Sequence, residues 1–367
     1  GRPRPNAAGW LDRTGRFAGH WLACTGRSAG GRCAARYRAC VKAIVRSAYG
    51  SPDILRLEEV PTPVPGDGEV LVRIRAASVN RADLDALTGQ PVMFRAFMGP
   101  RRPRNHRLGL DAAGEVEAVG SGVTRYRPGD RVYSNLTMYG LGAFAELACA
   151  PEKAWHPIPA GLDFEGASTI PEAAILAFQG LGGREGVKRG DRVLINGASG
   201  STGLFALQLA KDAGAEVTAV CSPSKADLVR SLGADHVIDY TTEDYTRGGQ
   251  RYDRILDGAG NRSVFEVRRA LAPDGVYLSV GGVSPSTGRI FQTMILGPLL
   301  SIGRRRSMGL LLKWKPNDAK DMATLGELLQ AGRLKPVIDR TYPLAQVPDA
   351  LRYLAAGKPR GKLVITM

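Results

Sequence analysis

The stretch Arg192-Val-Leu-Ile-Asn-Gly-Ala-Ser-Gly-Ser-Thr-Gly203 decides the fold class of this chain. The apolar run Val193–Ile195 predicts a buried strand. After a glycine-dense turn, Leu204–Gly214 has helical apolar spacing and closes on a capping glycine. A second strand is expected over Glu216–Val220. Strand, turn, helix and strand in this order form a βαβ unit.

The turn of this unit fits a known fingerprint. Ala198-x-Gly200-x-x-Gly203 matches the dinucleotide-binding pattern, with alanine in place of the first glycine. In a βαβ unit such a turn lets a pyrophosphate rest on the helix N-terminus. An ordinary tight turn is the alternative, and the strand–turn–helix–strand context favours a dinucleotide. The expected contacts come from Ala198, Ser199, Gly200, Ser201, Thr202 and Gly203.

Length and charge narrow the possible partners. The 367 residues suggest about two domains, and no apolar run approaches the length of a membrane span. A formal charge of +15 would normally favour nucleic acid as a partner. Residues 1–40, however, hold eight arginines and one acid, which leaves +8 for the other 327 residues. We therefore expect neither a nucleic-acid nor a membrane partner.

The segment 1–40 differs from the rest of the chain. It is rich in Gly, Ala and Arg and has no periodicity, which favours a disordered basic extension. A targeting peptide and a nucleic-acid-binding tail remain alternatives. The spacing of its three cysteines does not match a zinc knuckle. Cys149 and Cys221 are isolated, as in reduced cytosolic proteins, so a cytoplasmic location is expected.

The remainder is expected to form an α/β protein with three parts. Residues 41–168 are rich in short strands and turns, which predicts a partly open β-barrel. Residues 169–316 alternate strands and helices, which predicts a doubly wound parallel sheet, and residues 317–367 return to the first domain. The expected strands are 41–46, 69–76, 112–119, 131–134, 143–149, 192–196, 216–220, 236–239, 254–257, 275–281, 308–313, 337–342 and 362–366. Helices are expected from a cap at Asn317 or Asp318 to Ala331, and around 350–356.

Together these motifs resemble the medium-chain dehydrogenase/reductase superfamily, in its zinc-independent quinone oxidoreductase branch. The resemblance covers Val41 to Met367 and implies a GroES-like catalytic domain with an inserted Rossmann domain. It rests on Ala77-Ser-Val-Asn-Arg-Ala-Asp83, Gly109-Leu-Asp-Ala-Ala-Gly114, Gly190-Asp-Arg-Val-Leu194, Gly197–Gly203, Leu232-Gly-Ala-Asp-His-Val-Ile-Asp-Tyr240 and Pro336-Val-Ile-Asp339.

The resemblance also bears on metal binding. Zinc members place a cysteine where this chain has Asn80, and a His-Glu pair where it has Leu110-Asp111. These replacements ligate zinc poorly or not at all. His106 and His156 stand alone, and a lone histidine beside a strand is more often structural. We expect no zinc.

The second strand of the nucleotide domain bears on the cofactor. NAD enzymes usually end this strand with an acid that accepts hydrogen bonds from the ribose. Here Cys221-Ser-Pro-Ser-Lys225 contains no acid, and Ser222 and Lys225 could bind a 2′-phosphate, which favours NADPH over NADH. The alternative is that Lys225 starts a solvated helix face. By resemblance, Tyr240 lines the same site, Arg360 is a weaker phosphate candidate, and Gly281 and Gly282 approach the nicotinamide.

Without a metal, reduction of a conjugated acceptor is the least demanding hydride transfer. Asn80 is the catalytic candidate, as an amide donor toward the acceptor oxygen; capping of the next helix is its alternative role. Tyr133 and Tyr139 could line the pocket or simply pack. Related reductases often carry a tyrosine where this chain has Met93 and Phe94, so Phe94 suggests an apolar, permissive site. Solvent is the expected proton donor.

These inferences favour an NADPH-dependent, zinc-independent reductase of quinones or α,β-unsaturated carbonyls. A metal-free alcohol dehydrogenase is one alternative, and a non-enzymatic NADPH-binding protein is another. By resemblance, a homodimer is expected.

Overall fold

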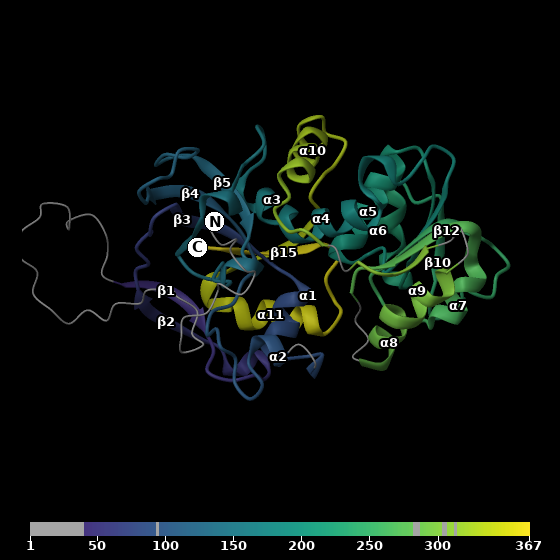
Figure 1. The fold of residues 1–367 in the computed structure, drawn as a ribbon, viewed down its shortest axis with the longest axis horizontal. Coiled ribbons are helices and arrows are strands. Elements are labelled where there is room, and N and C mark those ends of the chain that lie inside the picture. Colours follow the sequence, from purple (N-terminus) through teal and green to yellow (C-terminus); the bar gives the residue numbers. More distant parts are fainter. Residues whose placement is uncertain (1–39, 93–94, 282–286, 303–306, 312–313) are drawn as a thin grey trace, which may run out of the picture.

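The computed structural model describes residues 40–92, 95–281, 287–302, 307–311 and 314–367. Most of the proposed extension, residues 1–39, therefore lies outside the described residues. A six-stranded and a seven-stranded sheet occupy opposite halves of the molecule (Figure 1). Between them lie the helices α3 (Phe164–Ser168), α4 (Ile170–Gly180) and α10 (Ala319–Gln330). Among the described residues, no helix is both long and apolar enough to cross a membrane.

The six-stranded sheet is parallel throughout and has the order β10-β9-β8-β11-β12-β13. The chain leaves β8 toward β9 and β10 on one side and returns to β11, β12 and β13 on the other, so the order reverses between β8 and β11. This is the doubly wound sheet that the sequence predicts. Its strands are β8 (Arg192–Asn196), β9 (Glu216–Cys221), β10 (His236–Asp239), β11 (Tyr252–Asp257), β12 (Leu271–Ser279) and β13 (Ser307–Leu310).

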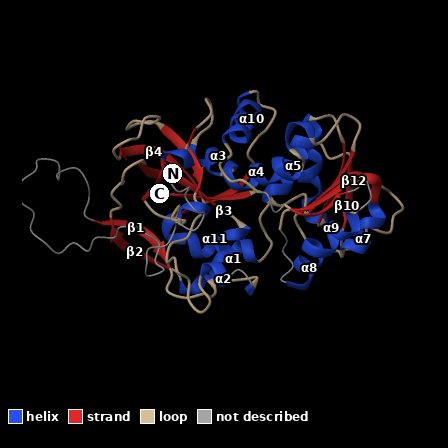
Figure 2. Cartoon of the chain, viewed as in Figure 1, coloured by secondary structure: helices blue, strands red, loops and turns tan. Residues whose placement is uncertain are grey.

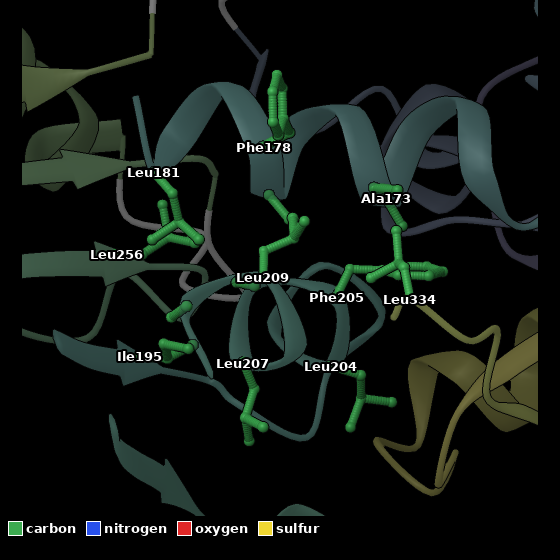
Figure 3. Close-up of a cluster of buried hydrophobic side chains, with 14 of the residues drawn as sticks. Ala173, Phe178, Leu181, Ile195, Leu204, Phe205, Leu207, Leu209, Leu256 and Leu334 are labelled. Atoms are coloured by element: carbon green, nitrogen blue, oxygen red, sulfur yellow. The ribbon is translucent and has the colours of Figure 1, made fainter. Parts of the chain in front are cut away.

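Helices cover both faces of this sheet (Figure 2). They are α5 (Ser201–Asp212), α6 (Ala226–Ser231), α7 (Val264–Ala270), α8 (Thr287–Phe291) and α9 (Gly297–Ser301), with the π-helical segment Gln292–Leu296 between the last two. Helix α4 (Ile170–Gly180) packs over α5. Phe178 of α4 and Leu181, the residue that caps its C-terminus, lie above Leu209, while Ile195 and Leu256 come from the sheet (Figure 3). Each such side chain stabilises the fold by about 1.5–3 kcal/mol when fully buried.

The second sheet has the order β14-β15-β3-β4-β5-β7, and β6 also pairs with β3. A separate two-stranded sheet joins β1 and β2. The core of this half includes Ile74, Leu108, Phe144 and Trp155. The strands are β1 (Cys40–Val45), β2 (Arg56–Pro61), β3 (Glu69–Val79), β4 (Asp111–Val119), β5 (Arg131–Asn135), β6 (Leu147–Pro151), β7 (His156–Pro157), β14 (Ile338–Pro343) and β15 (Lys362–Thr366).

The C-terminal tail completes the second sheet. Strand β15 lies between β14 and β3, with Leu363 opposite Val79, so segments from both ends of the chain share one sheet. The tail also contains α10 (Ala319–Gln330) and α11 (Val347–Ala355). The remaining helices of this half and of the boundary are α1 (Arg81–Thr88), α2 (Arg95–Met98) and α3 (Phe164–Ser168).

The structure corrects one expected strand, selects one of the two expected helix caps and adds one strand. The strand expected over 143–149 begins at Leu147, because Leu141 and Gly142 adopt left-handed backbone conformations and Ala143 bonds to the carbonyl of Gly109 instead. Helix α10 is capped by Asp318, whose Oδ1 accepts from the backbone N–H groups of Lys320 and Asp321. Strand β2 was not predicted, because its side chains are mostly exposed and carry no apolar alternation.

Candidate active site

The glycine-rich turn after β8 is shaped by close backbone approach. Gly197 has a φ of +83°, and Gly200 is the N-cap of α5. A Cβ on Gly203 would lie 2.3 Å from the Gly197 oxygen and 2.7 Å from the Ala198 Cα, so only glycine fits there. Ala198 is buried, whereas Ser199, Ser201 and Thr202 are half-buried. The turn therefore leaves the N-terminus of a twelve-residue helix available for an anion.

The other candidate cofactor residues follow neighbouring strands of the same sheet. Ser222 follows β9, Tyr240 follows β10, and Gly281 lies two residues beyond β12 with a φ of +126°. Because the strands are parallel, all these positions lie at the carboxyl edge of the sheet, where ligands bind in doubly wound folds. We call the turn and these positions the cofactor edge. Gly282 and Phe94 lie outside the described residues.

Lys225 lies just beyond the end of β9. The Lys225 Nζ donates to the Gly357 carbonyl oxygen at 3.0 Å, and the tail continues to exposed Arg360. Burial lowers the pKa of Lys225, the Asp339 carboxylate raises it, and the positive charge of Arg360 lowers it further. Tyr240 is half exposed, and its backbone N–H points to the Cys221 oxygen at 3.4 Å.

One residue of the cofactor edge was missed in the sequence. Asp257 ends β11 with no exposed surface and accepts hydrogen bonds from Asn196 Nδ2, Tyr277 Oη and the backbone N–H groups of Ala259 and Gly260. Burial raises the pKa of Asp257 in spite of these donors. The carboxylate holds the loop after β11 beside the point where the strand order reverses. An acid that ends an apolar run before Gly-Ala-Gly is the signal that could have found it.

Between the two sheets lies a group that we call the buried polar cluster. Each of its side chains is at most 8% exposed. They come from α1 and its cap, β4, β5, α4 and β15. The members are Asn80, Asp83, Asp111, Asn135, Glu172 and Lys362.

Hydrogen bonds join these side chains into one network. Lys362 Nζ donates to Asn80 Oδ1 at 2.6 Å and lies 3.8 Å from Asp111 Oδ2. Asn80 Nδ2 donates to Asp111 Oδ2 at 3.0 Å. Asn135 Nδ2 donates to Asp111 Oδ1 at 3.0 Å and to Glu172 Oε2 at 2.8 Å. The network thereby connects α4 to the seven-stranded sheet.

The cluster holds protons at neutral pH. Burial, helped by the nearby Asp111 carboxylate, raises the pKa of Glu172 to about 8. Burial also raises the pKa of Asp83 to about 8 and lowers the pKa of Lys362, against the attraction of Asp111. Desolvation thus favours the protonated, neutral carboxyl groups, while the attraction of the neighbouring carboxyl groups opposes loss of the proton from the Lys362 ammonium group. Sequence reasoning had identified Asn80 and Asp111 but not Glu172, Asn135 or Lys362.

Comparison with known proteins shows which family this chain resembles. Residues 66–160 match the alcohol dehydrogenase GroES-like domain, and residues 232–365 match the zinc-binding dehydrogenase family. A chloroplastic quinone oxidoreductase of Triphysaria versicolor is 32% identical over 335 residues, covering 89% of this chain and 98% of the relative. The 2-methylene-furan-3-one reductase of Solanum lycopersicum is 32% identical over 338 residues, covering 89% and 79%. The quinone oxidoreductase structure from Coxiella burnetii superposes with a TM-score of 0.78 at 29% identity, covering 89% and 99%.

The chain belongs to the quinone oxidoreductase-like branch of the medium-chain dehydrogenase/reductase superfamily. The resemblance that the sequence motifs indicate is therefore confirmed, as is the combination of a GroES-like domain with a Rossmann-type sheet. The protein is an oxidoreductase, and membership of this superfamily implies a nicotinamide cofactor.

The residues at the superfamily's metal position do not fit a zinc ion. Leu110 offers no donor, Asn80 offers one amide oxygen, and the Lys362 ammonium group already binds that oxygen. A cation 3.8 Å from the Asp111 carboxylate also competes with any metal for it. In the described part of the chain, no group of three or more His, Cys, Asp or Glu side chains is placed to hold a metal ion.

The histidines and pocket tyrosines singled out in the sequence serve packing and backbone contacts. His106 Nδ1 bonds to the Arg46 oxygen, and His156 Nε2 bonds to the Asn317 oxygen. Tyr133 is 1% exposed and meets the His156 ring edge-on, so a substrate would reach it only after rearrangement. Tyr139 is half-buried against the core of the seven-stranded sheet. Of the two tyrosines, only Tyr139 is exposed enough to stay a pocket candidate.

Proposed function

We propose that this oxidoreductase reduces quinones or α,β-unsaturated carbonyl compounds with NADPH and without zinc. The observation that carries the proposal is the pairing of two features. The segment that follows β9 at the dinucleotide-binding edge carries Lys225 and no acid, and the superfamily's metal position holds an amide bonded to a lysine. A conjugated acceptor suits this arrangement because its developing charge spreads to an oxygen that a hydrogen-bond donor can stabilise.

The preference for NADPH rests on charge. Residues 221–225 contain no carboxylate that would repel a 2′-phosphate, and Asp239, at the end of β10, is turned to the Thr241 backbone and hydroxyl. Lys225 uses one ammonium hydrogen on Gly357, which leaves two for a phosphate. We assign Ser222, Lys225, Tyr240 and Arg360 to the 2′-phosphate, and residues 198–203 to the pyrophosphate.

The protein's own residues orient the reactants and stabilise the charge that develops on the acceptor oxygen. The bound cofactor supplies the hydride. Asn80 donates from Nδ2 toward the acceptor oxygen, and Gly281 and Gly282 leave room for the nicotinamide end. In this proposal, Asn80 belongs to a catalytic domain formed by residues 41–168 and 317–367. The cofactor edge belongs to a nucleotide domain formed by residues 169–316. A proton from solvent completes the product.

The relatives support two classes of acceptor. One is a quinone oxidoreductase and another a 2-methylene-furan-3-one reductase, and both are conjugated-acceptor reductases by name. The test follows NADPH absorbance with a panel of quinones, enones and aldehydes, before and after chelation. Turnover of quinones or enones that survives chelation supports the proposal. Turnover of aldehydes alone favours an alcohol dehydrogenase, and tight NADPH binding without turnover favours a non-enzymatic binding protein.

We also propose a homodimer. Strand β13 pairs only with β12 in the described part of the chain, so its outer edge is open to a second copy. Beside it, the helical stretch from α8 to α9 exposes four large apolar side chains, Phe291, Ile295, Leu299 and Ile302, by 42–72%. Sedimentation of the wild type and of Leu299→Asp tests this: a dimer that dissociates in the variant is expected, and a monomeric wild type contradicts it.

The cytoplasm is the proposed location. It rests on the isolated Cys149 and Cys221, which suit a reducing compartment. Relatives named as chloroplastic or mitochondrial make a targeting role for residues 1–40 the competing proposal. Fractionation of cells that express the full chain separates the two.

A further inference from the structure

We propose that Lys362 is a positioning residue that orients and polarises the Asn80 carboxamide. This inference rests on the proposed function, because it concerns the donor that stabilises the acceptor oxygen. It adds a residue from the far end of the chain: Lys362 and Asn80 are 282 positions apart.

The burial of Lys362 is the first observation. It opens β15, is 1% exposed, and its ammonium group lies inside the molecule. An enclosed ammonium ion is costly unless carboxylates and hydrogen-bond acceptors surround it. Asp111, Glu172 and Asp83 all act on it electrostatically, in that order of strength. Its direct hydrogen bond in the cluster, however, goes to the neutral Asn80 oxygen at 2.6 Å rather than to a carboxylate.

That bond fixes which way the carboxamide faces. An ammonium group can only donate, so the Asn80 atom beside Lys362 must be the oxygen. The Asp111 carboxylate on the other side takes a hydrogen from Nδ2 at 3.0 Å. A flipped amide would set its NH₂ against the ammonium group and its oxygen against the carboxylate. Lys362 and Asp111 therefore hold one orientation between them.

The second Nδ2 hydrogen is the one left for a substrate. Its protein partner is the Ser78 carbonyl oxygen at 3.4 Å, which is near the limit of a hydrogen bond. A substrate oxygen can replace so long a bond at little cost. Because hydrogen bonds in a chain polarise one another, the cation on Oδ1 makes this N–H a stronger donor. The backbone of Asn80 is held as well, since its N–H donates to Asp83 Oδ2 at 2.8 Å.

The test measures steady-state oxidation of NADPH with 1,4-naphthoquinone by the wild type, K362M, N80A and the double variant. If Lys362 acts through Asn80, K362M lowers kcat about ten-fold or more and N80A about 100-fold. The double variant is then no slower than N80A, and KM for NADPH stays within about two-fold. K211M is the matched control, because Lys211 also pairs with a carboxylate (Asp235, 2.7 Å) but lies on α5, outside the buried polar cluster. We expect the kcat of K211M to equal that of the wild type.

Three outcomes overturn this proposal while leaving the proposed function in place. In the first, K362M keeps the wild-type kcat. In the second, the losses of the single variants multiply in the double variant, which means that Lys362 acts independently of Asn80. If K362M does not fold, the variant N80D takes its place. The new carboxylate of that variant can still accept a hydrogen bond from Lys362 but has no N–H to donate. The third outcome is a wild-type kcat in N80D. Wild-type protein that turns over no acceptor at all removes the proposed function together with this inference.

Discussion

The cofactor edge and the buried polar cluster each contain a lysine, and the two lysines differ in exposure and in hydrogen bonding. Lys225, at the cofactor edge, is half-buried and uses one hydrogen bond to a backbone carbonyl, so it keeps donors for a ligand. Lys362, in the buried polar cluster, is 1% exposed and bonded to Asn80 among carboxyl groups. The comparison teaches that the first lysine can bind a ligand, whereas the second can only arrange other side chains.

The largest expected effect comes from the backbone of the cofactor edge. In Gly203→Val the new Cβ would lie 2.3 Å from the Gly197 oxygen, so the turn must open. We expect loss of NADPH binding by more than about 100-fold and a fall of about 3 kcal/mol in unfolding free energy. Titration calorimetry and chemical denaturation measure both. Gly248→Ala is the control, because a Cβ there meets nothing within 4 Å. Unchanged NADPH affinity in Gly203→Val would remove the turn from the binding site.

The buried polar cluster should make the unfolding free energy of the protein depend on pH. The folded protein holds the Glu172 proton up to about pH 8, while the unfolded chain releases it near pH 4.5. Unfolding therefore releases a proton between these values, so stability falls as pH rises toward 8 and is retained at low pH. From pH 6 to pH 8 this amounts to about 2 kcal/mol, at about 1.4 kcal/mol per pH unit for one proton.

Glu172→Gln removes this contribution and keeps an oxygen for the bond from Asn135. Urea denaturation of both proteins at pH 6 and pH 8 makes the comparison, and Asp83, whose pKa shifts the same way, is present in both. We expect the wild type to lose about 2 kcal/mol more than the variant over this range. Parallel losses in the two proteins would mean that Glu172 is ionised in the folded state.

At the cofactor edge, Lys225→Ala tests the free donors of that lysine. We expect KM for NADPH to rise about ten-fold or more, as for loss of a charge-assisted hydrogen bond, with KM for NADH within about two-fold. Lys320→Ala, an exposed lysine on α10, is the control. Equal effects on NADPH and NADH would show that Lys225 supports the tail through Gly357 rather than a 2′-phosphate.

The smallest effect is expected at Arg360. Its guanidinium group is exposed, and a solvated cation adds little to phosphate binding. Arg360→Ala should raise KM for NADPH about two- to three-fold at low salt, and less at high salt because exposed charges are screened. Lys358→Ala, two positions away on the same tail, should leave KM unchanged. A salt-independent effect of Arg360→Ala would indicate a direct, enclosed contact.

The two regions also differ in how far the sequence predicts them. The cofactor edge is local: residues 197–203 carry a strand, a turn and a helix start in one stretch, and the strand order follows from repeated βα units. The absence of an acid after β9 is likewise visible in the sequence. Gly282 and Phe94 lie outside the described residues and stay predictions.

The buried polar cluster is not local. Asn135 and Glu172 meet across 37 positions, and Asn80 and Lys362 across 282, in segments whose patterns only indicate strands or a helix. A lysine at the start of a strand ordinarily predicts a solvated side chain, and only the insertion of β15 between β14 and β3 encloses it. Tyr133 shows the same limit, because the residues that enclose it come from distant parts of the chain.

The central claim is that the protein reduces conjugated acceptors with NADPH and without a metal. The most direct measurement is NADPH oxidation in the presence of 1,4-naphthoquinone by protein treated with a strong chelator, compared with untreated protein and with NADH. The account predicts equal kcat before and after chelation, and kcat/KM at least about ten-fold higher with NADPH than with NADH. Activity that disappears on chelation and returns with zinc would contradict it.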